Sequence, residues 1–292
     1  MNRKVGIVGT GVMGAPMAHN LLAAGYPLQA WNRSPEKLRN VAAAGGEVCD
    51  TPAQAAVDVD VLICMLSDGP TCDAVLFGNT GESVVDAMKT GSTLVVMSSI
   101  PVETSQVQAE RCRERGLGYL DAPVSGGEQG AREATLAIMV GGDAETFSAT
   151  ESVLSAMGRA VHVGPAGTGQ QAKLANQMIV ASTIATVAEA LLFAERGGAD
   201  PAKVRDALSG GFADSPIMRQ HGLRMIEESF APGGAAKYQL KDTHTAMERA
   251  ETLGLKLPVA TVADELFEAM VEHGDGDLDH SGLIRELRRL NA

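Results

Sequence analysis

The sequence predicts an α/β protein in which a doubly wound, mostly parallel sheet is followed by an all-helical region. Three observations lead to this prediction. A strand pattern at residues 5–8 runs into a glycine-rich turn, strand and helix patterns alternate to about residue 163, and one unbroken helical pattern covers residues 168–196 with no strand pattern after it. We therefore predict an α/β domain over residues 1–163 and a helical domain over residues 164–292, joined by a long helix.

The first element is a short apolar strand that breaks into a glycine motif. Gly9, Gly11 and Gly14 follow the strand in the spacing Gly-x-Gly-x-x-Gly, and a helical pattern follows them. The first glycine permits a tight turn, the second lets the backbone approach a pyrophosphate, and the third lets the helix pack closely on the strand. A glycine-rich turn without a ligand is the alternative. We interpret the motif as a Rossmann dinucleotide site whose contacts include Gly9, Thr10, Gly11, Val12, Met13 and Gly14.

The end of the second strand pattern indicates which dinucleotide binds. Residues 27–31 lead into Asn32, Arg33 and Ser34, about twenty residues past the glycines, where NAD-specific enzymes carry an acid that accepts from the ribose 2′-OH. All three side chains here can donate hydrogen bonds, and Arg suits a phosphate. The sequence therefore favours NADP(H) over NAD(H). The alternative is that Arg33 is a solvated residue at the start of a surface helix.

The remaining elements follow in order along the chain. Residues 59–65 and 93–97 resemble buried strands, and shorter strand patterns lie near 117–120, 136–140 and 161–163. Helical patterns lie between them, at 101–114 with Pro at its first position and at 144–157. The helix predicted over 168–196 is roughly 40 Å long at 1.5 Å per residue and ends at Gly197 and Gly198.

The long helix carries a polar group on an otherwise apolar surface. Lys173, Asn176 and Gln177 lie at positions i, i+3 and i+4, so their side chains share one face. A lysine there is either a solvated surface residue or one held beside a partly dry cleft, where its pKa falls towards neutrality.

Composition narrows the function classes. A net charge of −12 without any cluster of basic residues argues against nucleic-acid binding. The four cysteines form no CxxC pair and are interpreted as reduced thiols of a cytoplasmic protein. The longest apolar runs are expected to fall short of a membrane span. We expect no metal site, because the histidines lack ligand spacing and Asp275, Asp277 and Asp279 lack the glycine and distal glutamate of a calcium loop.

Four stretches of the chain together resemble the β-hydroxyacid dehydrogenase family, over nearly the whole length. They are Gly9-x-Gly11-x-Met13-Gly14 with Pro16 to Leu21, Asp121 to Gly127, Gly164 to Asn176 with Lys173, and Lys241-Asp242. Within that family the segments following Ser125, Thr135, Lys173 and Leu278 look most like the branch that reduces tartronate semialdehyde (2-hydroxy-3-oxopropionate) to glycerate.

The resemblance implies a role for each motif. It makes Lys173 the catalytic lysine, which as an ammonium donates a proton to a carbonyl oxygen while the nicotinamide delivers hydride. It makes Ser125, Gly126 and Gly127 a substrate loop whose N–H groups and hydroxyl hold a carboxylate. Asn176 or Gln177 would also hold the substrate. Further cofactor contacts are implied for Leu66, Ser67, Thr71, Ser99 and Lys241, with Asp242 orienting Lys241.

Two departures from the family pattern concern the substrate. Relatives often carry Asn four residues after the lysine, whereas here Asn176 stands at +3 and Gln177 at +4. Gly234 stands where many relatives carry Phe, so we expect empty space about the size of an aromatic ring and a wider pocket.

The expected function is an NADP(H)-dependent reductase that interconverts a short aldehyde acid and its β-hydroxyacid. Alternative substrates for the same type of enzyme are 3-hydroxyisobutyrate, succinic semialdehyde and glyoxylate. An imine reductase and a non-catalytic nucleotide sensor are the alternatives from other classes. The small-molecule acid is the only partner expected besides further copies of the chain, because the apolar faces of the long helix favour a homodimer or homotetramer.

Overall fold

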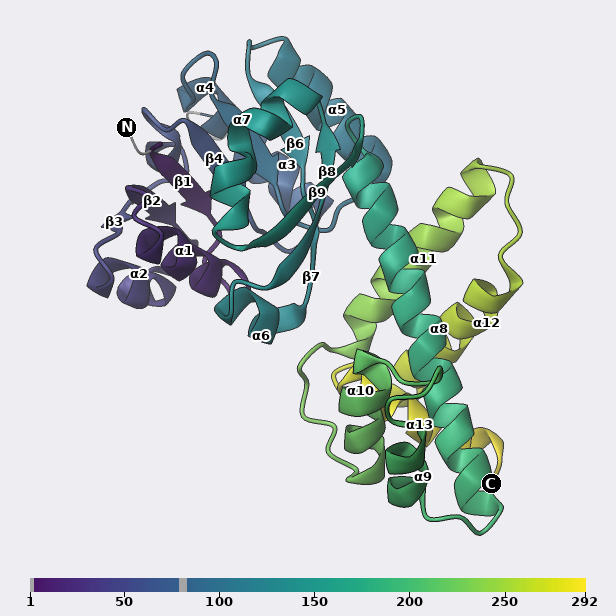
Figure 1. The fold of residues 1–292 in the computed structure, drawn as a ribbon. Coiled ribbons are helices and arrows are strands. Elements are labelled where there is room, and N and C mark those ends of the chain that lie inside the picture. Colours follow the sequence, from purple (N-terminus) through teal and green to yellow (C-terminus); the bar gives the residue numbers. More distant parts are fainter. Residues whose placement is uncertain (1–2, 79–82) are drawn as a thin grey trace. The chain divides into compact units, whose positions relative to one another are not determined.

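The computed structural model describes residues 3–78 and 83–292, and the chain divides within one helix into two units, Met1–Lys173 and Leu174–Ala292 (Figure 1). We call them the sheet unit and the helical unit. The strands of the sheet unit are β1 Val5–Val8, β2 Leu28–Trp31, β3 Glu47–Val48, β4 Val61–Cys64, β5 Thr93–Val96, β6 Gly118–Asp121, β7 Val124–Ser125, β8 Leu136–Gly142 and β9 Gly158–Gly164.

These strands form one nine-stranded sheet in the order β3-β2-β1-β4-β5-β6-β8-β7, with β9 beside β8. The pairs from β3 to β6 are parallel, whereas β8 runs antiparallel to β6 and β7 and parallel to β9. The predicted doubly wound, mostly parallel sheet is confirmed. The short β3 and β7 have no counterpart among the predicted strands, because two residues are too few to produce a hydrophobic period.

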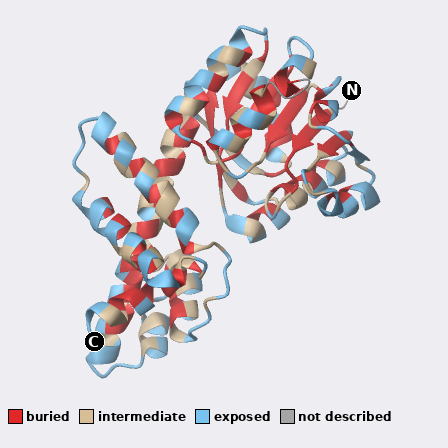
Figure 2. Ribbon diagram, turned by 180° about the vertical axis from the view of Figure 1, so that it is seen from behind, coloured by how far each residue is buried: buried red, intermediate tan, exposed pale blue. Residues whose placement is uncertain are grey.

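Helices cover both faces of the sheet, as the alternation of side chains along its strands requires. In β4, Ile63 belongs to one buried cluster with helices α1 (Gly14–Ala23) and α7 (Ala144–Ser155). Leu62 and Cys64 belong to a second cluster with α3 (Gly69–Phe77), α4 (Val84–Ala87) and α5 (Val102–Arg113). Figure 2 shows the central strands as the buried centre of this unit, whereas β3 is exposed and β9 alternates between partly exposed and exposed residues. The helical segments are α1 Gly14–Ala23, η1 Pro35–Leu38, α2 Arg39–Ala43, η2 Gln54–Ala56, α3 Gly69–Phe77, α4 Val84–Ala87, α5 Val102–Arg113, α6 Gly127–Arg132 and α7 Ala144–Ser155.

A single long helix, α8 Thr168–Arg196, passes from the sheet unit into the helical unit, with the bounds that the sequence predicts. Pro101, by contrast, precedes α5 rather than opening it. The other segments of the helical unit are α9 Pro201–Leu208, α10 Pro216–Ile226, α11 Ala236–Thr252, α12 Pro258–Met270, η3 Val271–Asp275, η4 His280–Gly282 and α13 Leu283–Leu290.

The core of the helical unit forms around one face of α8. Ala181, Ile184, Ala188 and Leu191 recur every three or four residues and are buried with Phe267 of α12 and Leu283 of α13. Within the described part of the chain, α8 is long and apolar enough to cross a membrane by length and composition alone. The expectation that no apolar run reaches that length is therefore wrong, and the buried positions identify α8 as a core helix.

Candidate active site

The register of the parallel strands brings most of the predicted site segments to one edge of the sheet. Trp31, Val8, Cys64, Val96 and Asp121 are paired across β2, β1, β4, β5 and β6, so they form one row. The glycine turn, the Asn32 segment, the Leu66 segment and the Ser99 segment each follow one of these residues. The carboxyl edge of a parallel sheet is where open α/β proteins bind ligands.

The glycine turn after β1 is shaped as the motif predicts. Gly9 has φ of +99°, and a Cβ there would lie 2.2 Å from the Met65 carbonyl oxygen. A Cβ on Gly14 would lie 1.9 Å from the Gly9 carbonyl oxygen, so this glycine permits α1 to start against the turn. A Cβ on Gly11 would meet no atom within 4 Å, which leaves its backbone accessible. Val12, at the tip of the turn, is 66% exposed.

Thr10 and Asn32 fix the turn to the end of β2. The Asn32 carboxamide oxygen accepts from the Thr10 N–H at 3.0 Å, and its amide nitrogen donates to the Ser34 carbonyl at 3.0 Å. The Thr10 hydroxyl is buried and has no hydrogen-bond partner among the residues that the structure describes. Arg33 is exposed. An unpaired buried hydroxyl beside an accessible glycine backbone fits a phosphate-bearing dinucleotide, which offers acceptors at this place.

The predicted cofactor segments after β4 and β5 are tied together by serine and aspartate side chains. The Leu66 N–H donates to the Ser98 hydroxyl at 2.7 Å. The Ser67 hydroxyl donates to Asp68 at 2.7 Å and lies 3.2 Å from the Thr71 hydroxyl oxygen, and Asp68 caps α3 by accepting from the Thr71 N–H at 2.8 Å.

Sequence reasoning selected Ser99 in this region but missed Ser98 and Asp68. Ser98 is fully buried, whereas Ser99 is partly exposed. An Asp-Gly-Pro start of the helix after β4 is the capping signal that identifies Asp68 in the sequence. No signal in the sequence separates the two adjacent serines.

Ser125, Gly126 and Gly127 form the junction between β7 and α6. Gly126 has φ of +134° and Gly127 has φ of +61°, values that side chains larger than hydrogen disfavour. Ser125 is partly exposed, and Gly126 and Gly127 are exposed. The first N–H groups of a helix have no acceptor within it, so this junction presents donors next to a hydroxyl.

Lys173 lies in the second turn of α8 and is 9% exposed. The start of this helix is attached to the sheet by Asp121, whose carboxylate accepts from the Gly167 N–H and the Gln170 N–H, each at 2.7 Å. Burial raises the pKa of Asp121, and these two N–H groups oppose the rise. The sequence places Asp121 in the motif of residues 121–127 but indicates no role for it, because its partners lie 46 and 49 residues further along the chain.

The two amides after Lys173 differ in their contacts. Asn176 is partly exposed and donates to the Gln177 side chain at 2.9 Å. Gln177 is buried and donates to Asp242 at 2.8 Å and to Gln239 at 3.3 Å, both on α11. Asp242 also lies 3.2 Å from the Lys241 ammonium. The structure thus joins Gln177 to the Lys241-Asp242 pair through one carboxylate, as part of the helical unit.

The space expected beside Gly234 is filled. A Cβ on Gly234 would lie 3.0 Å from the His280 Cε1 and Nε2 atoms, so the imidazole of His280 occupies the place assigned to an aromatic ring. His280 stacks on His221 at 6.0 Å between ring centroids and meets Phe267 edge-on. Burial lowers the pKa of His280 to about 4 and lowers that of His221. The expectation of an empty, ring-sized space is therefore wrong.

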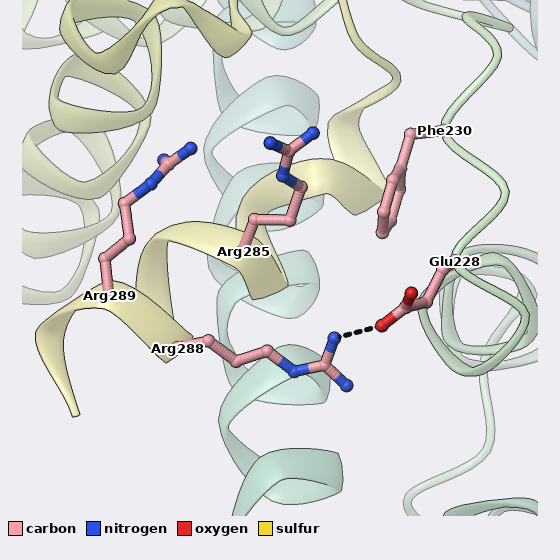
Figure 3. Close-up of a pocket in the computed structure, with 5 residues that line it drawn as sticks. All are labelled: Glu228, Phe230, Arg285, Arg288 and Arg289. Atoms are coloured by element: carbon pink, nitrogen blue, oxygen red, sulfur yellow. Dashed lines mark hydrogen bonds and ion pairs between the residues drawn. The ribbon is translucent and has the colours of Figure 1, made fainter. Parts of the chain in front are cut away.

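A separate hollow of about 460 Å³ lies in the helical unit, lined by Glu228, Phe230, Arg285, Arg288 and Arg289 (Figure 3). Its arginines already have acidic partners. Arg285 and Arg289 pair with Asp275, and Arg288 pairs with Glu228 and Glu195. The hollow is therefore lined by a network of ion pairs. Because its arginines are already paired with carboxylates, we do not interpret it as a site for an anionic ligand.

Comparison with known proteins covers both units. Residues 4–164 match the family model of the NAD binding domain of 6-phosphogluconate dehydrogenase, and residues 167–287 match the NAD-binding family model of NADP-dependent 3-hydroxyisobutyrate dehydrogenase. The chain is 44% identical over 288 residues to 2-hydroxy-3-oxopropionate reductase of Escherichia coli (strain K12), covering 97% of each chain.

Solved structures give the same picture. A Mycobacterium tuberculosis 3-hydroxyisobutyrate dehydrogenase with L-serine is similar with a TM-score of 0.88 and 31% identity, covering 99% of this chain and 100% of that one. An imine reductase from Pseudomonas sp. has a TM-score of 0.62 and 20% identity, covering 98% of this chain and 100% of that one. The second likeness concerns the fold alone.

Proposed function

The chain belongs to the β-hydroxyacid dehydrogenase family, and from this premise we propose that it is a tartronate semialdehyde (2-hydroxy-3-oxopropionate) reductase that uses NADP(H) and forms glycerate. As a member of the family it is an NAD(P)-dependent oxidoreductase that acts on CH–OH groups. The observation that carries the substrate assignment is the 44% identity to the Escherichia coli reductase of that acid over 97% of both chains.

Lys173 supplies the proton in the proposed reaction. It is largely buried on a helix whose start is attached to the sheet, so its ammonium is held in place. Bound NADPH would supply hydride for the aldehyde carbon, and the carbonyl oxygen would then need one proton to become a hydroxyl. A positioned lysine ammonium provides that proton, and in the reverse direction the neutral amine accepts it.

Binding of the substrate carboxylate is assigned to Ser125, Gly126 and Gly127. A hydroxyl and N–H groups at the start of α6 are donors suited to a small carboxylate. Of the two amides after Lys173, we assign substrate contact to Asn176, because it is partly exposed, whereas Gln177 is buried against Gln239 and Asp242.

The preference for NADP(H) is assigned to Arg33, with Asn32 and Ser34. Arg33 is exposed at the carboxyl end of β2, where an acidic residue would accept from the ribose 2′-OH of NAD. A guanidinium at that position can bind a 2′-phosphate through two hydrogen bonds at once, that is, in bidentate fashion. The remaining dinucleotide contacts are assigned to residues 9–14, Leu66, Ser67, Thr71, Ser99 and Lys241.

A panel of substrates tests the assignment. The purified chain is assayed with tartronate semialdehyde, succinic semialdehyde, glyoxylate and a cyclic imine, each with NADPH and with NADH, and with glycerate and 3-hydroxyisobutyrate in the oxidative direction. We expect tartronate semialdehyde with NADPH to give the highest kcat/KM. A higher kcat/KM with another acid refutes the substrate, and turnover of the imine without any aldehyde turnover refutes the reaction class.

We further propose that the enzyme is a cytoplasmic homodimer or homotetramer. Two large apolar side chains of α8 support an assembly through the helical unit, Ile179 at 67% and Phe193 at 83% exposure. Light scattering coupled to gel filtration measures the mass, and a mass of one 30.3 kDa chain at micromolar concentration contradicts the proposal.

A further inference from the structure

The first turn of α8 is capped by a carboxylate that comes from a distant strand. Asp121, the last residue of β6, is fully buried, and its two oxygens accept from the N–H groups of Gly167 and Gln170, each at 2.7 Å. The N–H groups at a helix start have no acceptor within the helix, and a side chain of the preceding loop usually accepts them. Here the sheet itself performs that role.

Two glycines make this contact possible. A Cβ on Gly169 would lie 2.5 Å from the Asp121 carbonyl oxygen and 2.8 Å from its Oδ2. A Cβ on Gly141, in β8, would lie 2.5 Å from Asp121 Oδ1 and 2.6 Å from the Gly169 nitrogen. The start of α8 therefore lies directly against the ends of the strands. A side chain at Gly141 or Gly169 would prevent this close approach.

A second attachment comes from the side chain of Gln170. It donates to the Ser98 carbonyl at 2.9 Å and accepts from the Ile100 N–H at 3.2 Å, so it binds the segment after β5. The first turn of α8 is thus fixed at β5 and at β6, and Lys173 follows Gln170 by three residues on the same face.

We propose that Asp121 and the side chain of Gln170 are positioning residues for the reaction: together they fix the rotation and the axial position of the first turn of α8 and thereby the place of the Lys173 ammonium. This inference rests on the proposed function, in which Lys173 is the proton donor. Proton transfer requires the donor within hydrogen-bond reach of the carbonyl oxygen, and a displacement of about 1 Å can cost on the order of a hundredfold in rate.

Asp121→Asn tests the inference, because it keeps the size of the side chain while replacing one of the two acceptors with an amide NH₂. We expect kcat for aldehyde reduction to fall by about ten- to a hundredfold, with an NADPH dissociation constant within about threefold of the wild type. The dissociation constant is measured by energy transfer from Trp31, the single tryptophan, to the reduced nicotinamide. A wild-type kcat in this variant refutes the inference.

Asp143→Ala is the control for the loss of a helix cap. Asp143 caps α7 in the same unit by accepting from the Glu145 and Thr146 N–H groups, each at 3.0 Å. Both N–H groups bind the same oxygen, Oδ2, which an asparagine carbonyl could replace, so alanine is the substitution that removes the cap, at a helix that does not carry Lys173. We expect its kcat to stay within about twofold of the wild type. An equal loss of kcat in both variants shows a general effect of uncapping and refutes the specific role of Asp121.

A double variant separates positioning from a merely structural role. If Asp121 acts through Lys173, Asp121→Asn in a Lys173→Ala background lowers kcat no further. A full additional decrease in that background refutes the inference. If Lys173→Ala alone keeps wild-type kcat, the proposed function fails; if Lys173→Ala is slow and Asp121→Asn is not, only the inference fails.

Gln170→Met provides the same test if Asp121→Asn does not fold. Methionine keeps the approximate volume of the side chain but removes both contacts to the segment after β5. We expect a decrease of kcat of about three- to tenfold with unchanged NADPH affinity, again absent in the Lys173→Ala background. Wild-type kcat in Gln170→Met then refutes the inference.

Discussion

At the scale of single residues, two neighbouring side chains at the end of β2 differ in their surroundings. Asn32 is hydrogen-bonded to the protein, whereas Arg33 is exposed to solvent. The Asn32 carboxamide contacts the Thr10 N–H and the Ser34 carbonyl, so it holds the glycine turn in place. Arg33, next to it, is exposed. This difference makes Arg33 the residue whose replacement is expected to change the proposed 2′-phosphate contact without changing the turn.

Arg33→Asp is expected to shift the ratio of kcat/KM for NADPH over NADH towards NADH by between ten- and a hundredfold, about 1.4–2.8 kcal/mol. The carboxylate would repel a 2′-phosphate and accept from a 2′-OH. Steady-state kinetics with both cofactors measures the ratio. Arg39→Asp, an exposed position at the start of α2, is the control for charge alone, and equal ratios in the two variants would show that Arg33 does not bind the phosphate.

Residues whose partners lie far away in the sequence were the ones that sequence reasoning could not resolve. The choice between Asn176 and Gln177 depends on Asp242, which lies 65 residues beyond Gln177. The space beside Gly234 depends on His280, since a glycine in the sequence does not indicate which segment packs against it. Lys173, in contrast, was selected from local helical spacing and from the motif around it.

At the scale of elements, the turn between β1 and α1 contains two glycines whose lack of a side chain matters for different physical reasons. A side chain on Gly14 would meet the protein's own backbone, and a side chain on Gly11 would meet no protein atom. The Gly-x-Gly-x-x-Gly spacing, a strand before it and a helix after it allowed this element to be predicted in full from the sequence. The same holds for α8, because a helical pattern of 29 residues has few alternatives.

We expect Gly14→Ala to lower the stability of the protein and Gly11→Ala to weaken cofactor binding. In Gly14→Ala a methyl group would lie 1.9 Å from the Gly9 carbonyl oxygen, so the turn must shift, and the free energy of unfolding should fall by about 1–3 kcal/mol. Gly11→Ala should keep the stability of the wild type but weaken NADPH binding by more than tenfold, because its methyl group faces the approaching pyrophosphate. Thermal unfolding and Trp31 energy transfer measure the two effects. Wild-type NADPH affinity in Gly11→Ala would place the pyrophosphate elsewhere.

At the scale of the whole molecule, each unit has its own interior chemistry. The sheet unit has an apolar core on each face of its sheet and groups its polar site residues at one edge. The helical unit contains a partly buried, stacked histidine pair, His221 and His280, beside Asp279, which pairs with Arg224 at 2.7 Å. Alternation of strands and helices predicted the doubly wound sheet of the first unit and its longer elements, but not short ones such as β3 and β7. The second was predicted only as helical, because the packing of several short helices leaves no period in the sequence.

The histidine pair makes stability depend on pH. The folded pKa of His280, about 4, lies below its ordinary value of 6.5. Between these values the unfolded chain binds a proton that the folded chain does not, so the free energy of unfolding falls as pH falls through this window. At pH 5 it should be about 2 kcal/mol lower than at pH 7.5, and the lowered pKa of His221 acts in the same direction.

Urea unfolding followed by far-ultraviolet circular dichroism at the two pH values measures this dependence. His280→Gln removes the titrating group, so the difference between pH 7.5 and pH 5 should be smaller than in the wild type by most of that amount. The same pH dependence in both proteins would assign it to other groups.

The role proposed for Lys173 is to provide the proton for reduction of an aldehyde acid. Its most direct test is a single-turnover experiment in which the NADPH-bound enzyme is mixed with tartronate semialdehyde and the loss of NADPH absorbance is followed, for the wild type, Lys173→Ala and Lys173→Arg. We expect Lys173→Ala to react about 10²–10⁴-fold more slowly, with NADPH affinity within about threefold of the wild type. Lys173→Arg should be nearly as slow, since a guanidinium keeps its proton. A Lys173→Ala enzyme that oxidises NADPH at the wild-type rate, with the chemical step limiting, would contradict the account.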